Sequence, residues 1–409
     1  MTDMTTTVMA KYGELFLKSD SVQRYYTKLL TKNIRMALKS ASLEGDIVLH
    51  RGRILVNGEK PGEIAEVLSK VFGIVSVSVA VCTSPDRDDI ENAAALYASK
   101  KLRPGMTFAV RARRSNVSGF TSQELGASAG SRIYEKVPGL TVNLTDPDYE
   151  IFVEARKEGG LIYDEAIQGP GGLPVGTQGK VLSLISAGID SPVASWLVLK
   201  RGCVVSYIHF DGGRYTGDDT KKASLENLAA LSRWTPGHKI EMLSVNVEPF
   251  YDALVKIENI KNRCLICKRF MLKTASGIAK KEGFLALVMG NNLGQVASQT
   301  LANIAVVESV VPSDIPVIQP LITYDKEETV RIARRIGTFR HLSGDVGCSV
   351  VPKHPAVSAT MDSVLDDEKE LDTEWLMTEC LSNTEVYSAL NGEIILRKRQ
   401  IIMQKDLKD

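Results

Sequence analysis

Ser186-Ala187-Gly188-Ile189-Asp190-Ser191-Pro192 is the stretch that decides the fold of the C-terminal half of the chain. Residues 181–185 before it form an apolar run that predicts a buried strand, and residues 193–199 after it predict a helix. Small residues in the turn let backbone amides approach a phosphate, and a helix N-terminus adds partial positive charge. We expect Ser191 to cap the helix and Pro192 to occupy its first turn. The segment predicts a nucleotide loop, with an ordinary strand–helix turn as the alternative.

Two common phosphate-loop motifs do not fit this part of the chain. A Walker loop fails because Gly179-Lys180 is followed by Val181, and Pro174 stands where the first glycine belongs. The dinucleotide fingerprint fails because Gly169 and Gly171 are followed by Pro174 rather than by a third glycine.

Short apolar runs alternate with helical patterns around the loop. The runs are residues 181–185, 204–210, 240–245 and 285–289. This alternation is typical of a doubly wound parallel sheet. The glycine- and proline-rich residues 169–179 predict a linker, and residues from 361 onward indicate a helical tail. We expect a C-terminal α/β domain over residues 180–409.

The N-terminal residues 1–83 follow the order β-α-β-β-α-β, which predicts a ferredoxin-like α+β domain. Residues 46–49 and 53–56 alternate around His50-Arg51-Gly52 as in a hairpin, and Pro61 suits a first helical turn. Residues 84–168 predict a second α/β domain of helix, strand, helix and strand pair.

One segment of this second domain is strongly basic. No acidic residue stands between Glu91 and Glu124, although the whole chain has 50 basic and 49 acidic residues and a net charge of +1. The basic residues of the segment are Lys100, Lys101, Arg103, Arg111, Arg113 and Arg114. Because the overall charge is balanced, a nucleic acid would need such a local patch, and we predict that it binds phosphate backbone. The alternative is a solvated face whose acidic partners come from elsewhere in the fold.

The composition and the first residues of the chain indicate which classes of protein are excluded or not expected. In 409 residues, 44% apolar and 24% charged side chains exclude a disordered or collagen-like chain. We expect no secretory signal, and Asp190 and Pro192 interrupt the apolar residues 181–199, so we expect no membrane span. Six cysteines without a signal indicate a reducing cytoplasm.

The nucleotide loop resembles the pyrophosphate-binding loop of the ATP pyrophosphatases, with Ala187 where that family usually has a second glycine. Further stretches resemble the tRNA 4-thiouridine synthetases (tRNA sulfurtransferases). They are KYGELFLK at 11–18, GNNLGQVASQT at 290–300, YDKE at 324–327, and FAVRARR at 108–114 with VNLTDPD at 142–148 in a THUMP RNA-binding segment that spans about 61–165. The resemblance covers the whole chain in the order ferredoxin-like, THUMP, pyrophosphatase.

The resemblance implies binding of ATP and Mg²⁺ and a set of site residues. The implied ATP contacts are the loop residues Ser186, Gly188 and Ser191 together with Leu184, Ile185, His209, Phe210, Lys268, Gly290 and Gln299. Asp190 and Lys326 are implied to be required for catalysis. Independently, His209 and Phe210 end a predicted strand, where open α/β sheets bind ligands, although both could be core residues. Lys326 could neutralise polyphosphate or be the solvated first turn of a helix.

Three cysteines are candidates for sulfur chemistry. Cys264 and Cys267 begin a predicted helix, where we expect depressed thiol pKa values, and Cys348 lies in a loop. Many family members carry the persulfide on a rhodanese domain; we expect none here, and the cysteine pair resembles the rhodanese-lacking, archaeal-type members. For these an iron–sulfur cluster on Cys264, Cys267 and Cys348 is implied, and Cys348 matches the catalytic, sulfur-handling cysteine of the family's pyrophosphatase domain. A persulfide or redox disulfide without metal, inert thiols, and zinc with His341 or His354 are alternatives.

The resemblance implies an ATP-dependent tRNA sulfurtransferase that adenylates O4 of uridine 8 and replaces it with sulfur, giving 4-thiouridine. A second implied role is sulfur supply for the thiazole of thiamine. The implied partners are tRNA and a sulfur donor, either sulfide or a persulfide carrier protein, and a homodimer is left open. Two alternatives are a tRNA-binding module without catalysis and an amidotransferase-like ATP pyrophosphatase that acts on a small molecule.

Overall fold

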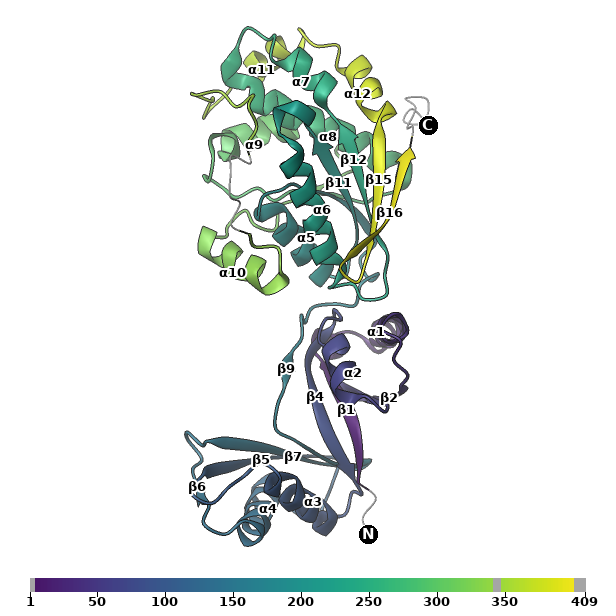
Figure 1. Cartoon of the computed structure of the whole chain (residues 1–409), viewed down its shortest axis with the longest axis vertical. Helices are drawn as coiled ribbons and strands as arrows, with labels where there is room; N and C mark the ends of the chain where they lie inside the picture. The colour runs from purple at the N-terminus through teal and green to yellow at the C-terminus, as the bar shows by residue number, and fades with distance from the viewer. Residues whose placement is uncertain (1–3, 341–346, 401–409) are drawn as a thin grey trace. The chain divides into compact units, whose positions relative to one another are not determined.

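The computed structural model describes residues 4–340 and 347–400. Contacts divide the chain into two compact units, residues 1–24 with 37–171 and residues 25–36 with 172–409. Each unit is a sheet with helices packed on it (Figure 1). None of the helices in the described ranges combines the length and apolar character that crossing a bilayer requires.

The first unit is built on one mixed sheet with the order β2-β3-β1-β4-β8-β7-β5-β6, and β9 also pairs with β4. Its strands are β1 (Thr5–Tyr12), β2 (Asp46–His50), β3 (Arg53–Asn57), β4 (Ile74–Thr83), β5 (Thr107–Ser115), β6 (Thr141–Val142), β7 (Tyr149–Arg156), β8 (Gly159–Tyr163) and β9 (Ile167–Gln168). Its helices are η1 (Glu14–Leu17), α2 (Pro61–Leu68), α3 (Arg87–Ser99) and α4 (Ser122–Lys136), and the ends of α1 (Asp20–Ser40) belong to it.

The strand and helix order confirms the predicted ferredoxin-like arrangement and the α/β segment that follows it. Ile54 and Val56 of β3 are fully buried, as the alternation around the β2–β3 hairpin predicts, and Pro61 begins α2. The long strand β4 pairs with β1 on one side and with β8 on the other. The ferredoxin-like strands and the later strands therefore share one continuous sheet.

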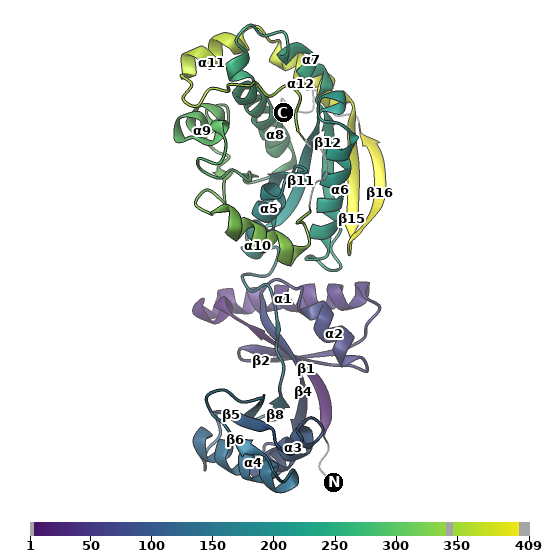
Figure 2. The ribbon, with the colours of Figure 1, turned by 60° about the vertical axis from the view of Figure 1, so that its left-hand side comes forward.

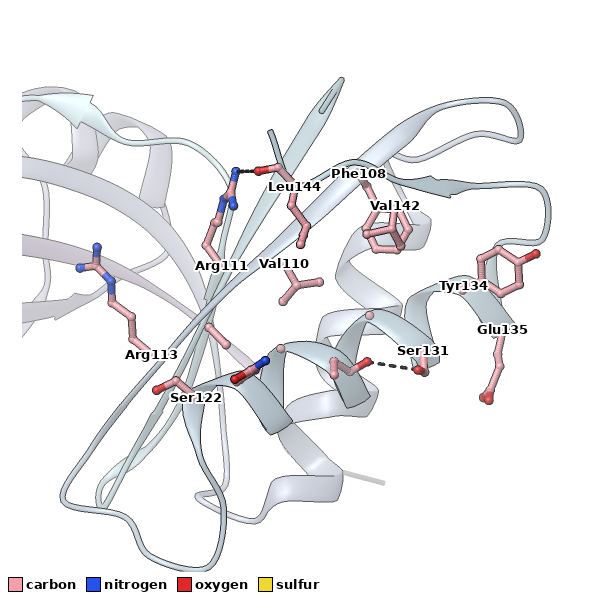
Figure 3. Close-up of a pocket in the computed structure, with 15 residues that line it drawn as sticks. Phe108, Val110, Arg111, Arg113, Ser122, Ser131, Tyr134, Glu135, Val142 and Leu144 are labelled. Carbon is pink, nitrogen blue, oxygen red and sulfur yellow. Dashed lines mark hydrogen bonds between the residues drawn. The ribbon is translucent and has the colours of Figure 1, made fainter. Parts of the chain in front are cut away.

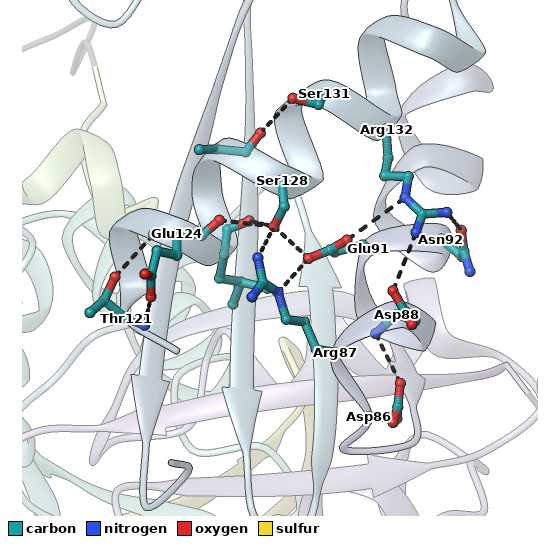
Figure 4. Close-up of polar contacts among 12 residues, drawn as sticks. Asp86, Arg87, Asp88, Glu91, Asn92, Thr121, Glu124, Ser128, Ser131 and Arg132 are labelled. Carbon is teal, nitrogen blue, oxygen red and sulfur yellow. Dashed lines mark hydrogen bonds and ion pairs between the residues drawn. The ribbon is translucent and has the colours of Figure 1, made fainter. Parts of the chain in front are cut away.

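A buried carboxylate ties α3 to α4 (Figure 4). Glu91 is 4% exposed, accepts a hydrogen bond from Arg87 Nε at 2.7 Å, and is hydrogen-bonded to the Ser128 hydroxyl of α4. Arg132, also on α4, reaches Asp88 at 3.2 Å. These contacts hold α3 and α4 together, and α4 packs against β5.

A second buried carboxylate lies within the sheet. Glu154 of β7 receives Arg53 from β3 at 2.6 Å and Lys11 from β1 at 3.0 Å, and it also contacts Arg156 and the Tyr163 hydroxyl. Burial alone would raise the pKa of Glu154, but the charges of Arg53 and Lys11 lower it to about 2. The carboxylate therefore stays ionised in the folded state at neutral pH.

We expect Glu154→Gln to destabilise the first unit by about 3 kcal/mol at pH 7, because buried cations lose their partner. A depressed carboxyl pKa stabilises the fold fully above the ordinary value and less as the pH falls towards about 2. The variant should therefore lose less stability on acidification than the wild type. All three tryptophans, Trp196, Trp234 and Trp375, lie in the second unit, so hydrogen exchange of β1 and β7 peptides is the measurement.

Glu150→Gln is the matched control on the same strand. Glu150 is half-exposed and pairs with Arg111, and such a pair contributes only about 0–1 kcal/mol. Equal loss of protection in both variants would show that the Glu154 cluster has no special weight.

The second unit is built on a sheet with the order β14-β13-β10-β11-β12-β15-β16. Its strands are β10 (Lys180–Leu184), β11 (Val204–Asp211), β12 (Ile240–Asn246), β13 (Leu287–Val288), β14 (Val317–Ile318), β15 (Thr384–Leu390) and β16 (Glu393–Gln400). Its helices are α5 (Asp190–Lys200), η2 (Gly213–Tyr215), α6 (Asp218–Ser232), α7 (Glu248–Leu254), η3 (Ile260–Asn262), α8 (Arg263–Glu282), η4 (Ala297–Gln299), α9 (Leu301–Glu308), α10 (Lys326–Ile336), α11 (Met361–Glu368) and α12 (Thr373–Ser382).

The five strands β10 to β14 pair in parallel, which confirms the predicted doubly wound core. Leu182 and Ile208 are fully buried on the face covered by α8, while Ser183 bonds Ser195 of α5 on the other face. Figure 2 shows α6 and α8 on either side of these strands. Because these strands are parallel, the C-terminal ends of β10, β11 and β13 lie at the same edge of the sheet.

The prediction of a helical tail from residue 361 onward is only partly right, because two strands follow the helices. After α11 and α12, β15 adds antiparallel to β12 and β16 pairs with β15. Asn391 and Gly392 both have positive φ, +51° and +98°, as in a two-residue hairpin turn. The Asn-Gly pair is the signal for this hairpin, and the acidic helices before it obscured it.

Candidate active site

The predicted nucleotide loop joins β10 to α5 at the sheet edge. The helix begins at Asp190 with Ile189 as its N-cap, and no side chain caps it. The expectation that Ser191 caps α5 is wrong, because Ser191 lies inside the first turn and its Oγ accepts the Ser186 amide at 2.8 Å. Ser191 therefore folds the loop back onto the helix start.

A residue that the sequence reasoning missed holds the other side of this loop. Asn227 of α6 is 1% exposed, and its Nδ2 donates to the Ser186 carbonyl at 2.9 Å. Together Ser191 and Asn227 fix both the amide and the carbonyl of Ser186. The signal was weak, because Ser224 and Asn227 are polar residues spaced i, i+3 that only the packing shows to be buried.

His209 lies at the end of β11, directly beside the loop strand. It is 2% exposed, and its Nδ1 lies 3.1 Å from the Ile185 carbonyl and 3.2 Å from Ser224 Oγ. Burial lowers its pKa, so the ring is neutral at pH 7. Its Nε2 has no hydrogen-bond partner in the part of the chain that the structure describes. Phe210 next to it is buried in the core, which agrees with the packing alternative.

Gly290 follows β13 and touches the start of α5. A Cβ at this position would lie 2.7 Å from the Ser191 amide nitrogen and 2.8 Å from its Cα. Both neighbours are backbone atoms, so they cannot rotate away. The close approach of residue 290 to the backbone at the start of α5 requires glycine here.

The structure brings Asp190 and Lys326 together, although 136 residues separate them. Lys326 Nζ lies 3.0 Å from Asp190 Oδ1, and Gln295 Nε2 donates to Asp190 Oδ2 at 3.2 Å. Lys326 opens α10 after the N-cap Asp325. The pair places one cation and one carboxylate at the mouth of the loop.

Two further predicted residues meet on one amide. Lys268 Nζ and Gln299 Nε2 both lie 3.3 Å from Oδ1 of Asn291, which is 5% exposed. Burial lowers the pKa of Lys268. Residues 268, 290, 291 and 299 therefore line the same edge of the sheet as the loop.

Comparison with known proteins agrees with this arrangement. Three family descriptions match the chain: thiamine biosynthesis protein (ThiI) over residues 176–373, ThiI ferredoxin-like domain over 7–78, and THUMP domain over 85–164. A probable tRNA sulfurtransferase of Methanosarcina mazei is 37% identical over 388 residues, covering 93% of this chain and 95% of that protein. One of Methanobrevibacter smithii is 40% identical over 363 residues, covering 87% and 93%.

The chain belongs to the tRNA sulfurtransferase family. Among solved structures, a 4-thiouridine synthetase–RNA complex with bound ATP resembles it with a TM-score of 0.80 and 28% identity. The likeness covers 96% of this chain and all of the other.

Two of the three cysteines singled out in the sequence, Cys267 and Cys348, interact with one tyrosine. Tyr251 of α7 is 4% exposed, its hydroxyl lies 3.5 Å from Cys267 Sγ, and it interacts with Cys348 as well. Cys264 lies one turn before Cys267 on α8 and interacts electrostatically with Cys348. Tyr251 is a residue that the sequence reasoning missed, because nothing in residues 248–254 distinguishes it from core.

The prediction of depressed thiol pKa values at the start of α8 is wrong. Burial raises the pKa of Cys264, and it raises that of Cys267 to about 12. Desolvation of a thiolate in this packed place outweighs the helix N-terminus. Both groups are therefore thiols at neutral pH without a bound cation.

The donor types suit an iron–sulfur cluster, but their spacing is not that of a closed site. In residues 4–340 and 347–400, no three His, Cys, Asp or Glu side chains are grouped as ligands of one metal ion. His354 is exposed, and His341 lies outside the described residues.

The basic segment of the family's THUMP domain is partly neutralised, as the solvated-face alternative anticipates. Lys101 pairs with Asp164, and Arg111 Nε lies 2.7 Å from Glu150. Arg103 donates to carbonyls of its own turn, and Arg114 donates to the Val117 carbonyl at 2.5 Å. The Arg113 backbone pairs with Glu154 of β7, whereas its side chain has no hydrogen bond or ion pair within the described ranges.

A groove runs between β5 and α4 beside these arginines (Figure 3). Its volume is about 1000 Å³. Arg111 and Arg113 lie on its strand side. Its helix side is lined by Gly126 and Gly130 together with Ser122, Gln123, Ala127, Ser131, Tyr134 and Glu135. The groove combines apolar walls with cationic groups, as a surface for nucleic acid does.

Proposed function

We propose that this protein is an ATP-dependent tRNA sulfurtransferase of the cytoplasm that converts uridine 8 of tRNA to 4-thiouridine. The observation that carries the proposal is that Lys326 and Gly290 meet the loop at Asp190 and Ser191, while Lys268 and Gln299 meet on Asn291 beside Gly290. Membership of the family and the likeness to a 4-thiouridine synthetase with RNA and ATP support it. Sulfur supply for the thiazole of thiamine is a second proposed role, in line with the family description.

In the proposed first step, O4 of the uracil attacks the α-phosphorus of ATP and pyrophosphate leaves. The loop amides at the start of α5 face the phosphates, held by Ser191 and Asn227. Lys326 offsets negative charge that develops on the phosphates, and Asp190 holds its ammonium in place. Mg²⁺, when bound to ATP, supplies further charge stabilisation.

In the proposed second step, hydrosulfide attacks C4 of the adenylated base and AMP leaves, so that oxygen is exchanged for sulfur. Cys348 handles the incoming sulfur, with Cys264 and Cys267 beside it. We propose that Cys264, Cys267 and Cys348, as thiolates, would hold an iron–sulfur cluster, which would supply a binding site for sulfide. The sulfur donor and assembly into a homodimer stay predictions.

The test uses the full chain with ATP, unmodified tRNA and sulfide. We expect pyrophosphate release that depends on tRNA, together with 4-thiouridine at position 8 detected by mass spectrometry of nucleosides. Pyrophosphate release without RNA would favour the small-molecule alternative. RNA binding without any pyrophosphate would favour the non-catalytic binding module, and either result would contradict the proposal.

The arginines of the groove are expected to contribute unequally to tRNA binding. Arg113→Gln should make the negative slope of the log tRNA-binding constant against log salt shallower by about 0.9, because the unpaired guanidinium neutralises one phosphate. Arg111→Gln should lower it less, since Glu150 already holds that side chain. Filter binding over a salt series measures both, with Lys60→Gln at the N-cap of α2 as a charge-matched control. Equal slopes in all four proteins would exclude β5 from the RNA interface.

A further inference from the structure

A small cavity in the first unit is lined by residues other than those of the groove between β5 and α4. It has a volume of about 80 Å³. His50 and Arg53 line it from the β2–β3 hairpin, Cys82 and Thr83 from the end of β4, and Arg156 from the end of β7. The volume is several times what one water requires, so the cavity has room for a small polyatomic ligand.

The charges at this cavity do not balance. Arg53 and Arg156 both reach the same oxygen of Glu154, at 2.6 Å and 3.1 Å, and Lys11 reaches the other oxygen. Three cations thus share one carboxylate, which leaves an excess of two positive charges in this cluster; Arg53 and Arg156 line the cavity, whereas Lys11 and Glu154 do not. The exposed Glu158 on the rim offsets only one of them.

Two of the residues that line the cavity, Arg53 and Thr83, carry a buried polar atom without a partner. The Arg53 side chain is 6% exposed, and its Nε has no hydrogen-bond partner in the described part of the chain. The Thr83 hydroxyl is also buried without a partner. A buried guanidinium with a free donor is costly unless an acceptor completes it, and an anion does so best.

The remaining lining does not oppose an anion. Burial raises the pKa of Cys82 to about 11, so this thiol is neutral at pH 7. His50 and Arg156 add donors from β2 and β7. Paired arginines are suited to phosphate oxygens because the guanidinium donors form a planar fork.

We infer that this cavity is a phosphate-binding site, built by Arg53 and Arg156 with His50, Cys82 and Thr83, that takes either a free phosphate or a backbone phosphate of RNA. A phosphate group brings one to two negative charges, which matches the local excess. The free-phosphate arm of the test does not depend on the proposed function, while the RNA arm rests on it.

The experiment follows alkylation of Cys82 in the full chain by peptide mass spectrometry. Inorganic phosphate is compared with chloride at equal ionic strength, and Cys203, buried in the second unit, is the internal reference. We expect phosphate to slow Cys82 alkylation at least threefold in the wild type. Arg156→Gln should abolish this protection. Lys157→Gln removes the same charge one residue away, on an exposed side chain that does not line the cavity, and should keep it.

A second variant keeps the test sharp, because Arg156→Gln also removes a partner of Glu154. His50→Gln changes the lining from another strand and should weaken the protection without touching that ion cluster. No protection in the wild type, or equal protection in Arg156→Gln, would overturn the inference.

The source of the phosphate is decided by replacing inorganic phosphate with tRNA. Protection of Cys82 by tRNA that is lost in Arg156→Gln assigns the site to the RNA backbone. Protection by phosphate alone assigns it to a free phosphate ligand.

Discussion

Cys348→Ser is expected to lower formation of 4-thiouridine by about 10³-fold or more while tRNA-dependent pyrophosphate release continues. Losses of this size follow removal of the group that carries out a chemical step. The separation is expected because Cys348 lies with Cys267 around Tyr251, whereas the loop contacts are made by Ser191 and Asn227. Both products are measured in the same reaction, pyrophosphate by a coupled assay and the thiolated nucleoside by mass spectrometry.

Cys203→Ser is the matched control for this result. Cys203 is a buried cysteine of the same unit that no feature of the site involves, and its replacement should leave both products near wild-type levels. If Cys348→Ser formed 4-thiouridine at the wild-type rate, the sulfur step would not use this residue, although the adenylation site would stand.

Lys326→Met is expected to lower tRNA-dependent pyrophosphate release by about 10²–10³-fold, the scale for loss of one group that stabilises developing charge. Methionine keeps the length of the side chain and removes only the ammonium. Because Asp190 contacts the same ammonium at 3.0 Å, the two residues should act as a unit. The double variant Asp190→Asn with Lys326→Met should then be no slower than Lys326→Met alone.

Lys369→Met controls for loss of a paired lysine elsewhere in the second unit. Lys369 is exposed and pairs with Asp366 at 2.7 Å, far in sequence from every loop residue, and its replacement should change the rate less than twofold. A rate for Lys326→Met close to that of Lys369→Met would assign Lys326 to the solvated first turn of α10.

Local sequence patterns predicted most of the fold because they reflect contacts close in the chain. The period of two in β3, Pro61 at the start of α2 and the small residues before α5 each act within a few positions. The pairing of β15 with β12 was not predictable in this way, because their partners are more than 140 residues apart. The Asn391-Gly392 turn alone does not specify which strand the hairpin joins.

The candidate site divides in the same manner. Asp190, Lys268, Gly290 and Lys326 could be named from motifs, whereas their convergence needed the fold. Asn227 and Tyr251 are buried next to the loop and the cysteines, and the sequence around them does not predict that their polar groups are buried there. The thiol pKa values were misjudged for a related reason, since a helix start predicts an effect that desolvation of Cys267 overrides.

The absence of a side chain at Gly290 suggests a way to make an inactive variant of this enzyme. A single methyl group there would press on the peptide backbone at the start of α5 while leaving every charged and sulfur-bearing side chain in place. A chain with alanine at this point would therefore serve as a loss-of-function allele for complementation in cells. Unlike a charge-deleting allele, it would alter the spacing of the nucleotide cradle and leave the electrostatic surface offered to RNA as it was.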